Sequence, residues 1–189
     1  MKFPLFSSSL MEAKAYALES MNHTMNYDGW ADQHRKLNRI VYGKFAQIYV
    51  ADWCQVNGIN YKKDISTPYI EDKEDIIIQG KRVDVKCSCI PSLVGQVSPG
   101  VVNSDCDYFC FLLLCRRLTW VEPHGFISCD NYRRGMIEVL KDQKIPETNI
   151  IQRFGSSYFL SSDSRKNLLP FVQTLLNGGL YKDASQKRG

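Results

Sequence analysis

The sequence has 189 residues, of which 44% are hydrophobic and 23% charged, and its formal net charge is +4. This length allows one substantial core, and the composition argues against a long disordered arm, so we expect a single domain over residues 1–189. The mild positive charge is compatible with nucleic-acid binding but does not by itself predict it.

The apolar runs are too short for an export signal or a membrane span. The run at residues 3–6 is followed at once by serines and charged residues, and the longest run, residues 109–115, is far below the ~20 residues that cross a bilayer. The cysteine count of seven is odd, which argues against a disulfide framework. We therefore expect a soluble cytoplasmic protein that binds no membrane.

Two helices are the first elements predicted along the chain. Residues 9–21 are rich in helix formers, and a longer helix is expected from about residue 31 to 57, with Gly58 at its end. One side of the longer helix carries small residues and a single polar one, Gln47, so this helix can sit close to whatever it covers. Gln47 is either a residue at the edge of a packed face or part of a site.

From Tyr61 the pattern changes to strands. The runs 75–78, 83–89 and 108–114 are rich in β-branched and aromatic residues. The run 108–114 lacks alternation, which predicts a central strand covered on both faces. Between the second and third runs, residues 90–106 are rich in Pro, Gly, Val and Ser and predict a long loop.

The remaining elements predict a mixed α/β fold. A helix capped by Asp130 would carry Arg133 and Arg134 in its first turn, where cations oppose the helix dipole and an anionic partner would help to explain them. The expected elements are a short strand at 125–129, a helix at 131–143, strands at 150–154 and 157–160, a helix at 164–177, and a weakly basic tail at 180–189.

Residues 75–89 predict a β-hairpin with a two-residue turn at Gln79-Gly80. In this register Asp75 falls directly opposite Asp84, with Cβ atoms about 4.5–5.5 Å apart on one face. Two such carboxylates repel each other unless a cation lies between them. Together with a backbone carbonyl and waters, they suit magnesium.

Side-chain alternation predicts two different faces for the second strand of this hairpin. Asp84, Lys86 and Ser88 share the face of the carboxylates, and Val83 and Val85 point to the core. Cys87 and Cys89 point to the core with them. Lys86 could hold a water or stabilise charge on a phosphate. A longer turn would shift the register by one residue and place the two carboxylates on opposite faces.

An acidic residue, an apolar strand, a tight turn and then Asp84-Val85-Lys86 resemble the PD-(D/E)XK nuclease superfamily, which includes restriction enzymes, resolvases and repair nucleases. The resemblance covers about residues 31–143 and implies a restriction-endonuclease-like core, with a central mixed sheet flanked by helices. It implies that Asp75, Asp84 and the carbonyl of Val85 bind Mg²⁺, or Mn²⁺ in its place. Lys86 would assist the attacking water, and Gln47 stands where the superfamily often has a glutamate.

The function expected from this resemblance is a magnesium-dependent DNA endonuclease. Cutting both strands of a duplex calls for two active sites, so we expect a homodimer or a larger homo-oligomer. The residues expected to contact nucleic acid are Ser88, Lys81, Arg82, Arg116, Arg117, Arg133 and Arg134.

Two other functions remain open on the sequence. A catalytically weakened nucleic-acid-binding or assembly module on the same fold is favoured by Gln47, because glutamine binds cations only weakly. A zinc-stabilised protein would rest on the Cys87–Cys89 and Cys106–Cys110 spacings, which match no common zinc finger.

Overall fold

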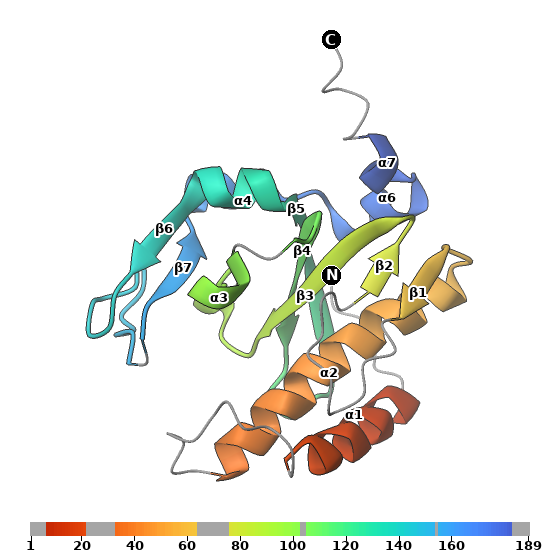
Figure 1. The fold of residues 1–189 in the computed structure, drawn as a ribbon, viewed down its shortest axis with the longest axis horizontal. Coiled ribbons are helices and arrows are strands. Elements are labelled where there is room, and N and C mark those ends of the chain that lie inside the picture. The colour runs from red at the N-terminus through yellow and green to blue at the C-terminus, as the bar shows by residue number, and fades with distance from the viewer. Residues whose placement is uncertain (1–6, 22–32, 64–75, 103–104, 154, 183–189) are drawn as a thin grey trace.

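The computed structural model describes residues 7–21, 33–63, 76–102, 105–153 and 155–182. They form a five-stranded sheet in the order β1-β2-β3-β4-β5 and a separate two-stranded sheet, β6-β7 (Figure 1). The strands of the larger sheet are β1 (Tyr61–Lys63), β2 (Ile76–Ile78), β3 (Lys81–Ser88), β4 (Tyr108–Leu114) and β5 (Val121–Ser128). Because β3 and β4 are parallel and the other pairs antiparallel, the predicted mixed sheet is confirmed.

Helices α1 (Ser7–Ser20) and α2 (Gln33–Val56) pack against each other, and α2 crosses the larger sheet beside β3 (Figure 1). Large side chains of α2, including Phe45 and Tyr49, share one buried cluster with the inward residues of β3. Gly58 adopts φ +65, a conformation that favours glycine, directly after this helix. The two predicted helices and the glycine stop are confirmed within the described residues.

Strand β4 is the centre of the fold. All seven of its residues are buried, and it lies between β3 and β5. Its side chains alternate between two cores. Cys110 and Leu112 join the cluster under α2, whereas Phe109 and Phe111 join a second cluster on the opposite face, together with Tyr132. The prediction of a central strand covered on both faces is confirmed.

The β2–β3 hairpin has the predicted register, with Ile76 opposite Val83 and Ile78 opposite Lys81. Both turn residues have positive φ, +51 for Gln79 and +76 for Gly80, as a two-residue turn of the I′ type requires. Gln79 is buried in this conformation, and its side-chain amide donates a 2.9 Å hydrogen bond to the carbonyl of Leu175. A contact from distant sequence therefore helps to hold the turn.

The predicted helix at 131–143 is wrong. Helix α4 spans only Cys129–Gly135, and its N-cap is Ser128 rather than Asp130. The chain then enters β6 (Met136–Val139), which pairs with β7 (Ser157–Leu160). Gly135, the last residue of α4, packs closely against a distant segment, because a Cβ at this position would come within 2.1 Å of the hydroxyl oxygen of Ser164.

The short α4 also changes the electrostatic argument for its arginines. Arg133 and Arg134 lie in the last turn of the helix, not in the first. Cations at a helix C-terminus interact favourably with its dipole. The helix therefore gives no reason to expect an anionic partner for them.

The C-terminal part is more broken than expected. The predicted single helix at 164–177 is replaced by α5 (Ser162–Arg165), α6 (Phe171–Leu176) and α7 (Gly179–Lys182). Between α5 and α6, Leu169 exchanges two backbone hydrogen bonds with Phe126 of β5, which no helical residue could do. A helix cannot run through this bridge.

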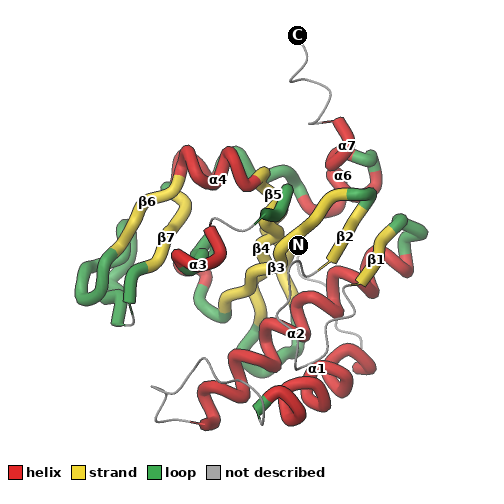
Figure 2. The backbone as a smooth tube through the Cα atoms, viewed as in Figure 1, coloured by secondary structure: helices red, strands yellow, loops and turns green. Residues whose placement is uncertain are grey.

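Other boundaries differ from the predicted ones (Figure 2). The strand expected at 125–129 is the end of the longer β5, and the 90–106 loop contains α3 (Pro99–Val102) and a short 3₁₀ turn at Pro91–Leu93. The strand expected at 150–154 is reduced to a bridge between Lys144 and Ile151. Over the described residues, no helix is both long and apolar enough to cross a membrane.

Candidate active site on strand β3

Strand β3 separates apolar from charged residues by simple alternation. Val83 and Val85 are buried in the cluster under α2, and Cys87 packs against the same cluster. Asp84 and Lys86 alternate with these residues and therefore point to the opposite face, where they pair in register with Phe109 and Phe111 of β4. This part of the predicted arrangement is confirmed.

Asp84 and Lys86 form an ion pair on that face. The Lys86 Nζ atom lies 2.5 Å from Oδ1 of Asp84, and the two side chains are 27% and 10% exposed, respectively. A carboxylate with so little contact to water needs a cationic partner, because unpaired burial of the charge would be strongly unfavourable. Lys86 meets this need through the ion pair that it forms with Asp84 beside the core.

A pair of thiols lies next to Asp84. The Sγ atoms of Cys106 and Cys129 are 2.6 Å apart, and both residues are buried. The pKa of Cys129 is raised, first by its contact with Cys106 and then by burial, and the charge of Asp84 adds to the rise. The two thiols are therefore close enough to Asp84 to be affected by its charge.

The second predicted carboxylate, Asp75, lies outside the described residues. The described ladder reaches the pair Ile76–Val83, one step before the predicted pairing of Asp75 with Asp84. The described residues contain no group of three His, Cys, Asp or Glu side chains that could hold a metal. Asp84 offers the oxygen ligand that magnesium prefers. Of the two carboxylates predicted to bind the ion, Asp84 is the one that lies within the described residues.

A cavity of about 760 Å³ opens beside Lys86. Its walls come from the second half of β3, from α2, from the 93–101 segment and from the 145–157 segment before and at the start of β7. Figure 1 shows α3 between the larger sheet and the β6–β7 pair. Arg39 and Arg153 line the same cavity as Lys86.

No sequence motif pointed to Arg39 or Arg153. Arg39 precedes Gly43 and Gln47 at successive spacings of four, so the three residues occupy one side of α2. That spacing could have linked Arg39 to the predicted site. Gln47 is half-buried on α2, and its approach to Asp84 stays a prediction. Arg153 belongs to the 145–157 segment, and the position of this segment beside β3 cannot be predicted from the local sequence pattern.

Ser88, Lys81 and Arg82 were expected to touch nucleic acid. The Ser88 hydroxyl instead closes a local turn, since it donates to the carbonyl of Ile90 and accepts from its N–H. Lys81 is half-buried at the turn end of β3. The guanidinium of Arg82 lies 2.5 Å from Asp105 and lowers the pKa of that carboxyl, chiefly through their hydrogen bond.

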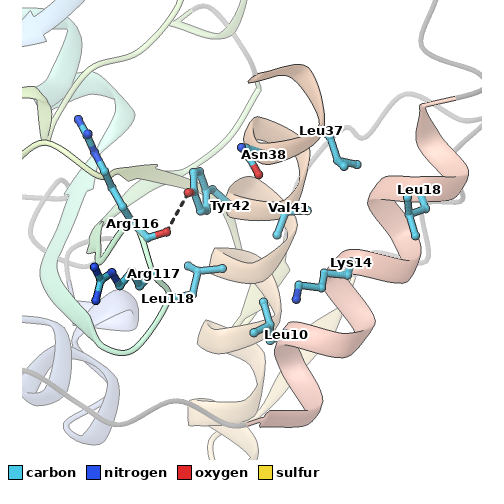
Figure 3. Close-up of a pocket in the computed structure, with 10 residues that line it drawn as sticks. All are labelled: Leu10, Lys14, Leu18, Leu37, Asn38, Val41, Tyr42, Arg116, Arg117 and Leu118. Carbon is cyan, nitrogen blue, oxygen red and sulfur yellow. Dashed lines mark hydrogen bonds between the residues drawn. The ribbon is translucent and has the colours of Figure 1, made fainter. Parts of the chain in front are cut away.

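Arg116 and Arg117 lie in a different place. They follow β4 and line a second cavity, of about 350 Å³, together with residues of α1 and α2 (Figure 3). The hydroxyl of Tyr42 donates a 3.0 Å hydrogen bond to the carbonyl of Arg116. The two cavities share no lining residue, so these arginines and Lys86 do not form one described cavity.

Arg133 is anchored within the protein. Its Nε atom donates to the carbonyl of Val102 at 3.0 Å, and its Nη1 atom lies 3.2 Å from the carboxylate of Asp130. Arg134 is exposed next to it. The residues predicted to contact nucleic acid therefore lie at several separate places. The cations that share a cavity with Lys86 are Arg39 and Arg153, which were not predicted.

Cys106 and Cys110, whose spacing could suggest a zinc site, do not lie in one cluster. Cys106 belongs to the core on the Phe109 face of β4, whereas Cys110 belongs to the core under α2. These two thiols therefore face opposite sides of the sheet and cannot share an ion. Comparison with protein-family models, with curated proteins and with solved structures gave no match for this chain.

Proposed function

We propose that this protein is a magnesium-dependent endonuclease that hydrolyses phosphodiester bonds of DNA. The observation that carries the proposal is the Asp84–Lys86 pair, 2.5 Å apart on one face of β3, with Lys86 also lining a cavity that contains two further cations. A carboxylate and an ammonium side by side at the edge of a cationic cavity suit an anionic substrate whose hydrolysis develops further negative charge.

Each residue has a defined role in this proposal. If the hairpin register continues by one residue, Asp75 stands opposite Asp84, and the two carboxylates with the Val85 carbonyl would hold the ion. Magnesium, when bound, would supply Lewis acidity at the phosphate. Lys86 would orient the attacking water and offset the charge that forms on the phosphate oxygens.

The arrangement of elements supports a restriction-endonuclease-like core. A long helix precedes the hairpin, and a fully buried strand follows it after a crossover that contains α3. The crossover makes β3 and β4 parallel, so that β3 lies beside the most buried strand of the sheet. The residues after Lys86 then lead directly into a wall of the cavity.

The burial of the Asp84–Lys86 pair also fits a second function, a binding or assembly module without catalysis. The side chain of Asp84 is only 10% exposed and is already paired with Lys86, which is how a structural ion pair inside a binding or assembly module would look. In that case the cavity would bind nucleic acid without cutting it. Residual binding without magnesium-dependent cleavage would identify this alternative.

The direct test is incubation of supercoiled plasmid with the protein, with magnesium and with EDTA. We expect nicked or linear DNA in magnesium alone, and about 10²–10⁴-fold slower cleavage by Lys86→Ala, the range for loss of a group assisting proton transfer. Lys166→Ala is the matched control, because Lys166 pairs with Asp163 on an exposed surface. Absence of cleavage under all divalent ions would exclude the endonuclease.

A homodimer or larger homo-oligomer is part of the same proposal. Two active sites are needed to cut both strands of a duplex at one place. Sedimentation of the protein with and without DNA would test it, and a monomer that only nicks would exclude it.

A further inference from the structure

The cavity beside Lys86 has a strongly biased charge. Arg39, Lys86 and Arg153 line it, and the described residues of its wall include no carboxylate. Lys86 is paired with Asp84, which lies outside this wall, and Arg39 and Arg153 add two further positive charges to the wall. The whole chain carries a net charge of only +4, so this concentration favours an anionic ligand.

A buried and hydrogen-bonded hydroxyl also lines the cavity. The hydroxyl oxygen of Ser157 accepts hydrogen bonds from Nε2 of Gln96 at 3.0 Å and from Nε2 of Gln152 at 3.1 Å. Ser157 is 5% exposed and still lines the cavity. A hydroxyl has two acceptor sites and one proton, so these two bonds leave its proton as the group to donate.

The hydroxyl proton of Ser157 therefore needs an acceptor of its own. Among the described residues, no acceptor takes it. A nearly buried O–H donor without an acceptor is unfavourable unless a ligand or a water accepts from it. A ligand acceptor atom at the inner wall of the cavity would meet this need.

The rest of the wall is apolar. Four half-buried aliphatic side chains line it: Leu93, Val101, Ile150 and Ile151. A phosphate ion alone would leave these side chains uncovered in a cavity of about 760 Å³. A stacked duplex presents its bases inside two backbones, and its bases could not reach the wall without leaving the stack.

We propose that this cavity takes one unpaired nucleotide of a nucleic-acid strand. The arginines bind its phosphodiester groups, the aliphatic wall covers the faces of its base, and Ser157 donates to an acceptor on the base edge. Enzymes that act on extruded nucleotides use this combination of apolar faces and hydrogen-bonding edges. The inference rests on the proposed function, because it makes the strand beside Lys86 a single-stranded or locally unpaired one.

Binding can be measured separately from cleavage. Fluorescence anisotropy in EDTA would compare a labelled single-stranded oligonucleotide, the same sequence as a duplex, and the single strand with one abasic position at its centre. We expect the single strand to bind about tenfold more tightly than the duplex. The abasic strand should bind several-fold more weakly than the intact strand, because it lacks the base that the aliphatic wall would cover. Preference for the duplex, or equal binding of the abasic strand, would overturn the proposal.

Protein variants locate the binding in the cavity. Arg153→Gln removes an exposed cation, and Ser157→Ala removes the donor; each should weaken single-strand binding about tenfold, as expected for a hydrogen bond to a charged or buried group. Lys166→Gln is the control for charge loss, because Lys166 is not in the cavity wall. If Arg153→Gln binds like wild type, the cavity assignment is wrong, whether or not Ser157→Ala folds.

The two proposals fail in different ways. Cleavage of plasmid with duplex-selective, Arg153-independent binding would keep the endonuclease and remove the nucleotide cavity. Tight Arg153-dependent binding of single strands without any cleavage would keep the cavity and remove the endonuclease. Competition by thymidine monophosphate tests whether the cavity binds a free nucleotide or a nucleotide within a strand. A free nucleotide that binds as tightly as the strand would overturn the proposal that the ligand is a strand.

Discussion

The ammonium of Lys86 lies 2.5 Å from the carboxylate of Asp84, two positions earlier on the same face of β3. Both residues are held by a strand whose other face is buried under α2. Neither side chain can turn to the opposite side without breaking the alternation of the strand. The pair is therefore a fixed element of the fold, and it is the natural place to test the proposed chemistry.

Asp84→Asn should abolish magnesium-dependent cleavage and leave DNA binding unchanged or tighter. The substitution removes a charge that would bind the ion, and it also removes repulsion between this carboxylate and phosphate. Plasmid cleavage and anisotropy in EDTA are the two measurements. Cleavage by the variant at the wild-type rate would remove Asp84 from the site.

The same variant should also unfold at lower urea concentration, because the ion pair between Asp84 and Lys86 is lost. Removal of one partner from a fully buried pair costs about 3–5 kcal/mol, and the 27% exposure of the Lys86 side chain should reduce this loss. Asp84→Asn combined with Lys86→Met provides the control. Recovery of stability in the double variant would confirm that the loss came from the broken ion pair.

Insertion of one alanine after Gly80 should abolish cleavage. The turn uses two residues with positive φ, and an extra residue would move one strand by one position relative to the other. Since side chains alternate with a period of two, either the apolar or the charged set would then face the wrong side. Circular dichroism and urea unfolding would show whether the protein still folds. A folded variant with full cleavage would contradict the register argument.

Gln47→Glu should change metal affinity or the preference between magnesium and manganese. Gln47 follows Arg39 and Gly43 along one side of α2, and Arg39 lines the Lys86 cavity. A carboxylate added near the ion would strengthen its binding. Isothermal titration with each metal would measure the effect. Superimposable titrations of wild type and variant would show that Gln47 only packs against its neighbours.

Cys115 should react with iodoacetamide before the other described cysteines. A hydrogen bond from Thr119 is the main cause that lowers the pKa of Cys115, whereas burial raises the pKa of Cys89 and of Cys54. A lowered pKa means more thiolate at any pH below the ordinary thiol pKa, and the thiolate is the nucleophile. Peptide mass spectrometry after brief labelling at pH 7.5 would identify the site.

Thr119→Val provides the matched test of this cause. The variant loses the 3.4 Å hydrogen bond to the Cys115 sulfur, so the pKa of Cys115 should rise and labelling at pH 7.5 should slow. The rates of the two proteins should converge as the pH rises above the ordinary thiol pKa. Equal rates at pH 7.5 would mean that Thr119 does not control the thiol.

The local sequence pattern was sufficient to predict the central strands of this protein. The turn at Gln79-Gly80, the burial of β4 and the facing of Asp84 and Lys86 all follow from a period of two and from turn chemistry. These features depend on residues that are neighbours in the sequence or in one hairpin. The sequence by itself therefore determined where the candidate chemistry lies and which face of β3 carries it.

Tertiary contacts decided the surroundings of that chemistry. Gly135 at the end of α4 packs against Ser164, and Leu169 bridges to Phe126, so distant segments lie against the chain where both predicted helices are interrupted. The cavity beside Lys86 likewise draws its walls from four separate segments of the chain. Helical propensity is worth less than about 1 kcal/mol per residue, and contacts between segments far apart in the sequence override it.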